Sequence, residues 1–174
     1  ADFGAKECLV RINPQDSPWG RDDAEAIAAA RPDGLVLPKV SSRASVDEVD
    51  QLVSAIEEQN NVQPGATSLV LIGTELPEAV FCLADMAGNG RVDGLTWGAE
   101  DLAGELGARA KRNAEGVYLD VFRFVRSSCL LAAVANQVHP IDTVFVEITE
   151  QVALAKECAE AAAMGFMGKL TIHP

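Results

Sequence analysis

Short apolar runs rich in β-branched residues alternate along this chain with alanine-rich or amphipathic segments. The runs have the length of strands and the segments have the length of helices, so the pattern predicts a repeated strand–helix order. Such an order implies parallel strands joined by right-handed crossovers. Strands are expected at 8–12, 35–40, 68–74, 93–98, 143–148 and 169–173. Helices are expected at 21–30, 45–59, 76–87, 100–107, 122–137 and 150–164, with a capping box at Ser45 and Glu48 and a stop at Gly165.

Two α/β architectures contain parallel strands of this kind, a closed (β/α)8 TIM barrel and an open doubly wound sheet. Six strand units in 174 residues fall short of the eight units and about 250 residues of a usual barrel. We expect a TIM barrel of which the chain covers strands 3–8, without the first two strands and the C-terminal tail. Residues 1–174 would form a single, incomplete barrel domain, because no linker-like tract divides them. The open sheet is the alternative.

Charge and cysteine usage limit the classes of partner. The net charge of -12 argues against nucleic acid, since phosphate backbones need clustered Lys and Arg. Apolar stretches are interrupted well short of the roughly 20 residues that cross a bilayer, so no membrane partner is expected. The chain has no Cys-x-x-Cys pair, which indicates reduced thiols and a cytoplasmic or organelle-matrix location. The cysteines are Cys8, Cys82, Cys129 and Cys158.

Acidic residues follow two of the expected strands. Glu75 follows the run at 68–74, and Asp101 follows the run at 93–98. Because the carboxyl ends of neighbouring parallel strands meet at one edge of a sheet, both carboxylates would lie there and could bind a hard cation. Arg11, at the end of the first run, adds a planar cation suited to a carboxylate or a carbonyl. The combination suggests a magnesium enzyme that acts on an anionic substrate.

Each of these residues also has a structural explanation. Glu75 and Asp101 could lie in the first turn of a helix, where the macrodipole favours a carboxylate without any metal. Arg11 could be a buried ion-pair partner. Lys39 could be an ordinary lysine at the sheet edge or a Schiff-base nucleophile, and the metal pair argues against the latter.

Two further residues are assigned structural positions. Arg126 lies in an expected helix and is predicted to form a surface or interface salt bridge. His139 precedes Pro140 and is predicted to lie in a loop.

Several segments match, in order, those of one known family. They are Val10-Arg11-Ile12-Asn13, Asp16–Gly20, Asp33–Val40, Thr74-Glu75, Trp97–Leu102, Arg126-Ser127, Ile141–Val144 and Gly165–Pro174. With them the chain resembles the citrate lyase β-subunit and malyl-CoA lyase-like group of magnesium-dependent (β/α)8 aldolases and lyases. The family's opening strands, which carry an acidic segment that supports the metal site, and its closing tail have no counterpart in the chain.

The resemblance implies roles for particular residues. Glu75 and Asp101 would bind Mg2+, and Arg11 would contact substrate oxygens, so these three are the predicted catalytic residues. The predicted substrate-binding residues are Arg11, Asn13, Lys39, Thr74, Gly98 and Ala99.

The resemblance also implies a reaction, the reversible carbon–carbon cleavage of a 3-hydroxyacyl thioester such as citryl-, malyl- or citramalyl-CoA into a keto acid and acetyl-CoA. Three alternatives stay open: a thioester hydrolase on the same metal site, a pyruvate-type metal aldolase, and a lyase subunit that is inactive without its partners. The expected partners are an acyl-CoA or carrier-bound thioester and further copies of the chain in a trimer or hexamer.

Overall fold

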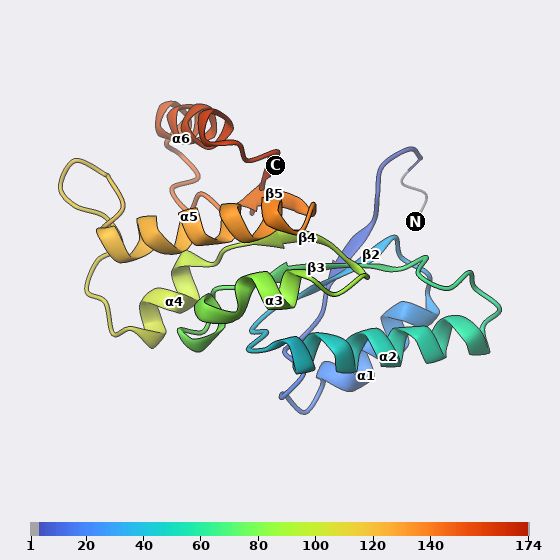
Figure 1. Cartoon of the computed structure of the whole chain (residues 1–174). Coiled ribbons are helices and arrows are strands. Elements are labelled where there is room, and N and C mark those ends of the chain that lie inside the picture. Colours follow the sequence, from blue (N-terminus) through green and yellow to red (C-terminus); the bar gives the residue numbers. More distant parts are fainter. Residues whose placement is uncertain (1–3, 174) are drawn as a thin grey trace.

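A computed structural model of the protein describes residues 4–173, so Pro174 of the last matching segment lies outside the described residues. Six parallel strands form one curled sheet in the order β1-β2-β3-β4-β5-β6 (Figure 1). They are β1 (Leu9–Arg11), β2 (Gly34–Leu37), β3 (Ser68–Ile72), β4 (Val92–Thr96), β5 (His139–Asp142) and β6 (Gly168–Lys169). A doubly wound sheet reverses its strand order part-way across, so that alternative is wrong.

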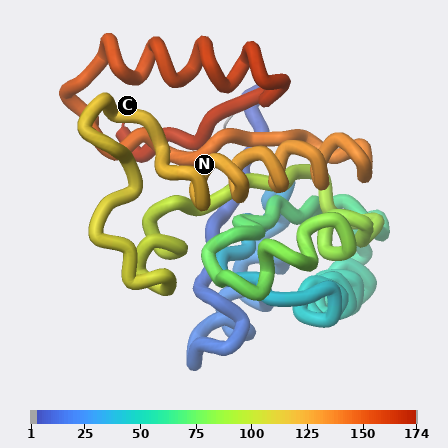
Figure 2. The backbone as a smooth tube through the Cα atoms, turned by 60° about the vertical axis from the view of Figure 1, so that its left-hand side comes forward, coloured from blue at the N-terminus to red at the C-terminus, as the bar shows by residue number. Residues whose placement is uncertain are grey.

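Helices connect successive strands. They are α1 (Gly20–Ala29), α2 (Arg43–Gln59), the 3-10 helix η1 (Glu78–Cys82), α3 (Leu83–Ala87), α4 (Ala99–Glu105), α5 (Asp120–Ala135) and α6 (Gln151–Met164). Sequential strand order with crossovers of one hand places the helices on one face of the sheet. Both views show α6 beyond α5, on the side away from α2 (Figures 1 and 2). Among the described residues, no helix is both long enough and apolar enough to cross a bilayer.

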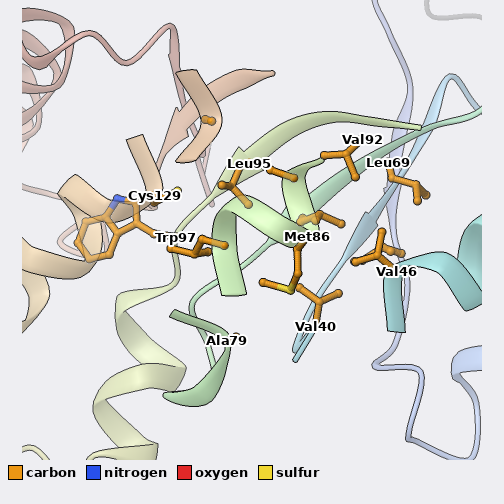
Figure 3. Packing of buried hydrophobic residues seen from close by; sticks show 14 of the residues in the cluster. Val40, Val46, Leu69, Ala79, Met86, Val92, Leu95, Trp97 and Cys129 are labelled. Carbon is orange, nitrogen blue, oxygen red and sulfur yellow. The ribbon is translucent and has the colours of Figure 1, made fainter. Parts of the chain in front are cut away.

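The core lies between the sheet and its helices. Alternate strand residues, among them Leu69 and Leu71 of β3, pack against apolar residues that recur at helical spacing, such as Val46, Val49 and Val53 of α2. Figure 3 shows this cluster extending from Cys129 on α5 to Val46 on α2. Val70 and Ile72, the intervening residues of β3, are buried as well. Burial on both faces explains why β3 reads as a continuous apolar run.

The predicted strand at 143–148 is wrong, since β5 is His139–Asp142 and 143–148 is irregular. The position of β5 is set by the end of α5. Gln137 has a φ of 60° and the N–H of Val138 donates to the Ala133 carbonyl, so the chain reverses at once and enters the sheet at His139. His139 is therefore in a strand and not in the predicted loop. The apolar alternation at 143–148 lies beyond the carboxyl edge.

Smaller differences concern the helix ends. The capping box of α2 joins Ser42 and Ser45, one turn before the predicted pair. The predicted helix at 76–87 is divided into η1 and α3, and β6 is shorter than the predicted strand at 169–173. Gly165 ends α6 with a φ of 111°, which confirms the predicted stop.

Candidate active site at the carboxyl edge of the sheet

Four charged side chains meet at the carboxyl ends of β1 to β4. Arg11 is the last residue of β1, and Lys39 follows β2. Glu75 follows β3, and Asp101 lies in the first turn of α4, which follows β4. Parallel pairing of these strands brings four positions that are distant in sequence to one edge, as the strand ends predict.

Glu75 is the buried member of this cluster, with 3% of its side chain exposed. Its Oε2 accepts a 2.6 Å hydrogen bond from the backbone N–H of Lys39, and its Oε1 lies 3.7 Å from Nη2 of Arg11. Burial raises the pKa of Glu75, and the Asp101 carboxylate raises it further, while the Lys39 N–H and the Arg11 charge act against both. A cation placed between the two carboxylates would relieve this repulsion.

Asp101 is half-exposed and turns towards Lys39. Its Oδ1 lies 3.5 Å from Nζ of Lys39. The preceding residue, Glu100, forms an ion pair with Lys111 instead. The two acidic residues that open α4 are thus separated, and only Asp101 joins the cluster with Glu75.

Gly98 allows Glu75 to occupy its place. A Cβ at Gly98 would lie 2.7 Å from Cγ of Glu75, which is closer than carbon atoms approach. The N–H of Gly98 donates to the buried Oγ1 of Thr74 at 2.9 Å, which joins the segment after β3 to the segment after β4. Thr74, Gly98 and the buried Ala99 therefore build the wall of the site. Their predicted contacts with substrate stay predictions.

Asn13 makes its hydrogen bonds elsewhere. Its side-chain amide donates to Oδ2 of Asp23 on α1 at 2.7 Å, and its backbone N–H donates to the same oxygen at 3.1 Å. Both bonds fix the segment that leads from β1 into α1, and so position Arg11 two residues earlier. The predicted substrate contact of Asn13 stays a prediction.

A comparison with protein families shows which family this chain resembles over its whole length. The family model described as HpcH/HpaI aldolase/citrate lyase matches residues 1–174. The chain belongs to this family. The family resemblance of the separate segments is thereby confirmed over the whole chain.

Relatives in the HpcH/HpaI aldolase/citrate lyase family differ in the activity they are named for. A (3S)-malyl-CoA thioesterase of Cereibacter sphaeroides is 33% identical over 174 residues, which are 100% of this chain and 55% of the relative. A citrate lyase subunit beta-like protein of Mycobacterium tuberculosis is 35% identical over 166 residues, which are 95% of this chain and 55% of that protein. The chain thus spans about half the length of the curated relatives it matches.

A solved structure supports the same assignment. The CitE protein of Mycobacterium tuberculosis, in complex with magnesium, acetoacetate and coenzyme A, is 34% identical to this chain and superposes with a TM-score of 0.79. The likeness covers 95% of this chain and 56% of that one. The curled sheet described above is therefore an arrangement that this family uses.

The carboxylate pair of this family member has the donor chemistry of a site for a hard divalent cation. Within residues 4–173, no group of three or more His, Cys, Asp or Glu side chains is arranged to hold a metal ion. Two carboxylates are the usual protein contribution to a Mg2+ site, where water and substrate oxygens complete the octahedron. A structural zinc site would need four protein ligands instead. Glu75 and Asp101 fit the first kind of site and not the second.

A second charged cluster lies beside the site, at the ends of β5 and β6. The sequence analysis did not predict this cluster. Asp142 is fully buried and accepts hydrogen bonds from Nε1 of Trp97 at 2.7 Å, from Arg126 and from Nζ of Lys169. Burial alone would raise the pKa of Asp142, but the Trp97 hydrogen bond and the charges of Lys169 and Arg126 hold it below its ordinary value. Because Trp97 directly precedes Gly98, this cluster braces the wall of the site.

The second cluster confirms that Arg126 forms salt bridges and corrects its predicted position at the surface. Its side chain is only 4% exposed, and Nη1 also lies 3.0 Å from Oε1 of Glu160 on α6. Lys169 bonds to Asp142 and to Glu157 of α6. Arg126 is thus a buried link between α5, β5 and α6 rather than a surface residue. The sequence signal for this buried link is the acidic residue Asp142 at the end of β5. A search for apolar patterns does not detect such a residue.

Proposed function

We propose that the protein is a magnesium-dependent carbon–carbon lyase that cleaves or forms a 3-hydroxyacyl thioester such as malyl-, citramalyl- or citryl-CoA. The observation that carries the proposal is the pairing of buried Glu75 with Asp101 at the carboxyl edge, beside Arg11 and Lys39. Membership of the family supports it, as do the names and bound ligands of the relatives.

Glu75 and Asp101 would hold Mg2+ in this proposal. When bound, the ion supplies a Lewis acid that stabilises the oxygen of the substrate hydroxyl as it becomes a carbonyl. The backbone N–H of Lys39 fixes Oε2 of Glu75, which orients that carboxylate before any ligand arrives. The Gly98 backbone leaves room for it. The position of Glu75 is thus preorganised by the strand ends.

Arg11 has the position and chemistry to bind the acid half of the substrate. Its side chain is 60% exposed, and the 3.7 Å contact of Nη2 with Glu75 leaves other guanidinium donors to face a carboxylate or an enolate oxygen. In the cleavage of malyl-CoA, the hydroxyl loses its proton and the bond between C2 and C3 of the acyl chain breaks. The electron pair enters the thioester enolate, which is then protonated. The products are glyoxylate and acetyl-CoA.

A thioester hydrolase is the second candidate, favoured by the 33% identity to the (3S)-malyl-CoA thioesterase of Cereibacter sphaeroides. The same carboxylate pair could serve hydrolysis if water attacks the thioester carbonyl and CoA leaves as the thiol. The difference lies in the products. Hydrolysis of malyl-CoA gives free malate, whereas lyase action gives glyoxylate and acetyl-CoA.

The test is product analysis of the full-length protein with malyl-, citramalyl- and citryl-CoA, with and without Mg2+. We expect a keto acid and acetyl-CoA, formed only with Mg2+ and lost in Asp101→Asn. Free hydroxy acid with CoA would replace the lyase by the hydrolase. Turnover of a keto acid and an aldehyde without CoA would favour a pyruvate-type aldolase. Activity only with added partner subunits and a carrier-bound thioester would assign a dependent lyase subunit.

Two proposals concern the architecture around the site. We propose that the six strands are six of the eight in a closed TIM barrel, which their sequential parallel order and the curl of the sheet support. We also propose a homotrimer or homohexamer. Exposed apolar side chains on η1 and α5 support an interface there: Phe81, Phe124, Leu131 and Val134. Light scattering of Leu131→Glu beside the native protein tests it, and an unchanged mass would exclude this interface.

A further inference from the structure

Lys39 has a backbone conformation that helix termination does not explain. Within residues 4–173, four non-glycine residues have a positive φ, namely Arg31, Lys39, Asn61 and Gln137. Three of them follow the ends of α1, α2 and α5, where a left-handed residue is a usual way to stop a helix. Lys39, with a φ of 52°, follows strand β2. Strained backbone outside a helix end is characteristic of functional sites.

This conformation lets one residue contact both carboxylates. The backbone N–H of Lys39 donates to Oε2 of Glu75 at 2.6 Å, while its Nζ lies 3.5 Å from Oδ1 of Asp101. Lys39 makes both contacts in this left-handed conformation. The contact with Glu75 is short and partly buried, whereas the ion pair with Asp101 is long and joins side chains that are 36% and 41% exposed. The backbone contact is therefore fixed, and the ammonium is free to move.

The charges of the cluster balance before any ligand binds. Arg11 and Lys39 carry two positive charges, and Glu75 and Asp101 carry two negative charges when both are ionised. A divalent cation between the carboxylates would leave the edge with two excess positive charges. The Lys39 ammonium and the bound cation would then both lie next to Asp101, and these two positive charges would repel each other.

We propose that Lys39 is a positioning residue that orients Glu75 through its backbone and keeps Mg2+ binding weak until an anionic ligand arrives. The inference rests on the proposed function, because it assumes that Glu75 and Asp101 hold the cation. A ligand with two negative charges offsets the excess charge fully, and a ligand with one offsets half of it. The edge is thus matched to a dianion, such as a dicarboxylate or a keto acid paired with an enolate oxygen. Lys39 therefore makes the binding of Mg2+ and the binding of the anion strengthen each other.

Calorimetric titration of the metal-free, full-length protein with MgCl2 tests the charge. We expect Lys39→Met, which keeps the length of the side chain, to bind Mg2+ about three- to tenfold more tightly than the native protein, since an exposed charge is partly screened. Lys39→Gly removes the charge and suits the positive φ, so it should tighten binding as much. Lys39→Arg keeps the charge and should bind as the native protein does.

The outcomes separate this inference from the proposed function. Unchanged or weaker Mg2+ binding in Lys39→Met and Lys39→Gly, with binding lost in Asp101→Asn, would overturn the role of Lys39 and leave the metal site standing. Failure of the native protein to bind Mg2+ even with saturating L-malate would overturn both. Circular dichroism of each variant identifies a change that comes from misfolding.

A second titration tests the link to the anion. Mg2+ affinity is measured with saturating L-malate, a dianion, and with L-lactate, which has the same hydroxy acid group and one carboxylate fewer. Malate should strengthen Mg2+ binding to the native protein more than lactate does, and by reciprocity Mg2+ should strengthen malate binding equally. The advantage of malate should shrink in Lys39→Met. An equal advantage in both proteins would contradict the proposal.

Discussion

The carboxylates at the amino end of the sheet have different partners from the two that follow β3 and β4 at its carboxyl end. At the amino end, Arg91 precedes β4 and donates to Oδ1 of Asp50 at 2.6 Å and to Oε1 of Glu57 at 2.9 Å. At the carboxyl end, the ion pairs of Glu75 and Asp101 have separations of 3.7 and 3.5 Å. Asp50 and Glu57 are saturated with short ion pairs, whereas Glu75 and Asp101 are left open to a ligand.

The pKa values follow the same division. Burial alone would raise the pKa of Glu57, but Arg91 and the backbone N–H groups of Thr67 and Gly65 outweigh it and lower that pKa. Burial and the nearby Asp101 raise the pKa of Glu75. A buried carboxylate with its own cation stabilises the fold, whereas one that faces a second carboxylate is suited to bind a cation from outside. In TIM barrels, stability lies at the amino end and chemistry at the carboxyl end.

Removal of a carboxylate at each end gives the largest expected contrast. Asp101→Asn should lower kcat/KM by about 100-fold or more, because the cation and the charge it stabilises are lost together. Asp50→Asn is the matched control at the amino end and should leave kcat/KM within about threefold of the native value. Steady-state kinetics at saturating Mg2+ measures both. Comparable losses of kcat/KM in the two variants would mean that catalysis does not depend on the carboxyl end alone.

Arg91→Met sharpens the comparison from the side of stability. It should lower the free energy of unfolding by about 3–5 kcal/mol, because Glu57 is left buried without its cation. Mg2+ affinity of the fraction that stays folded should not change. Urea denaturation followed by circular dichroism gives the first quantity, and calorimetry gives the second. A decrease in the free energy of unfolding of less than about 1 kcal/mol would show that water solvates Glu57 as well as the guanidinium does.

A change of one methyl group tests the wall between the strands. Gly98→Ala places a Cβ 2.7 Å from Cγ of Glu75, so Glu75 must move, and we expect Mg2+ affinity to fall by about tenfold with about 1–3 kcal/mol of destabilisation. Gly104→Ala, in the helix α4 that follows Gly98, meets no atom within 4 Å. It should leave Mg2+ affinity unchanged and stabilise α4 by up to about 1 kcal/mol. Equal Mg2+ affinity in both variants would show that Glu75 is not held by contact with Gly98.

The smallest expected effect is on the pH dependence of the metal-free protein. Because the folded-state pKa of Glu75 lies above its ordinary value of 4.5, the folded state retains this proton longer than the unfolded state. The stability that the protonated Glu75 contributes to the folded state is therefore lost as pH rises above 4.5 through the raised pKa. Glu75→Gln should raise the melting temperature at pH 7 without Mg2+ and lose this advantage below pH 4.5. A gain that is independent of pH would assign the effect to packing.

Local patterns predicted the parts of the fold and site that depend on strand ends. The runs before Glu75 and Asp101 are buried along most of their length, so β3 and β4 and the residues after them could be placed from the sequence. The same reasoning failed for β5, because apolar alternation at 143–148 suggested a strand while the turn at Gln137 had already brought the chain into the sheet. A turn that depends on the end of the preceding helix leaves little trace in a strand pattern.

Other features depend on contacts between distant segments and have no local signal. The left-handed Lys39 is joined by its backbone N–H to Glu75, which lies 36 positions later. The burial of Arg126 depends on Asp142, and neither residue type is expected inside a core. The sequence therefore indicated which residues form the site, but not which of them orient the others.

The bond between Trp97 and Asp142 gives the protein an optical probe beside its site. The chain has two tryptophans, and Trp19 is exposed whereas Trp97 is fully buried with its indole N–H on a carboxylate. Emission from Trp97 should lie at shorter wavelength than that of Trp19 and resist quenching by iodide. Because Trp97 is one residue from Gly98, whose backbone contacts Glu75, a ligand that shifts this carboxylate should change the emission of Trp97 in the native protein, without any attached dye.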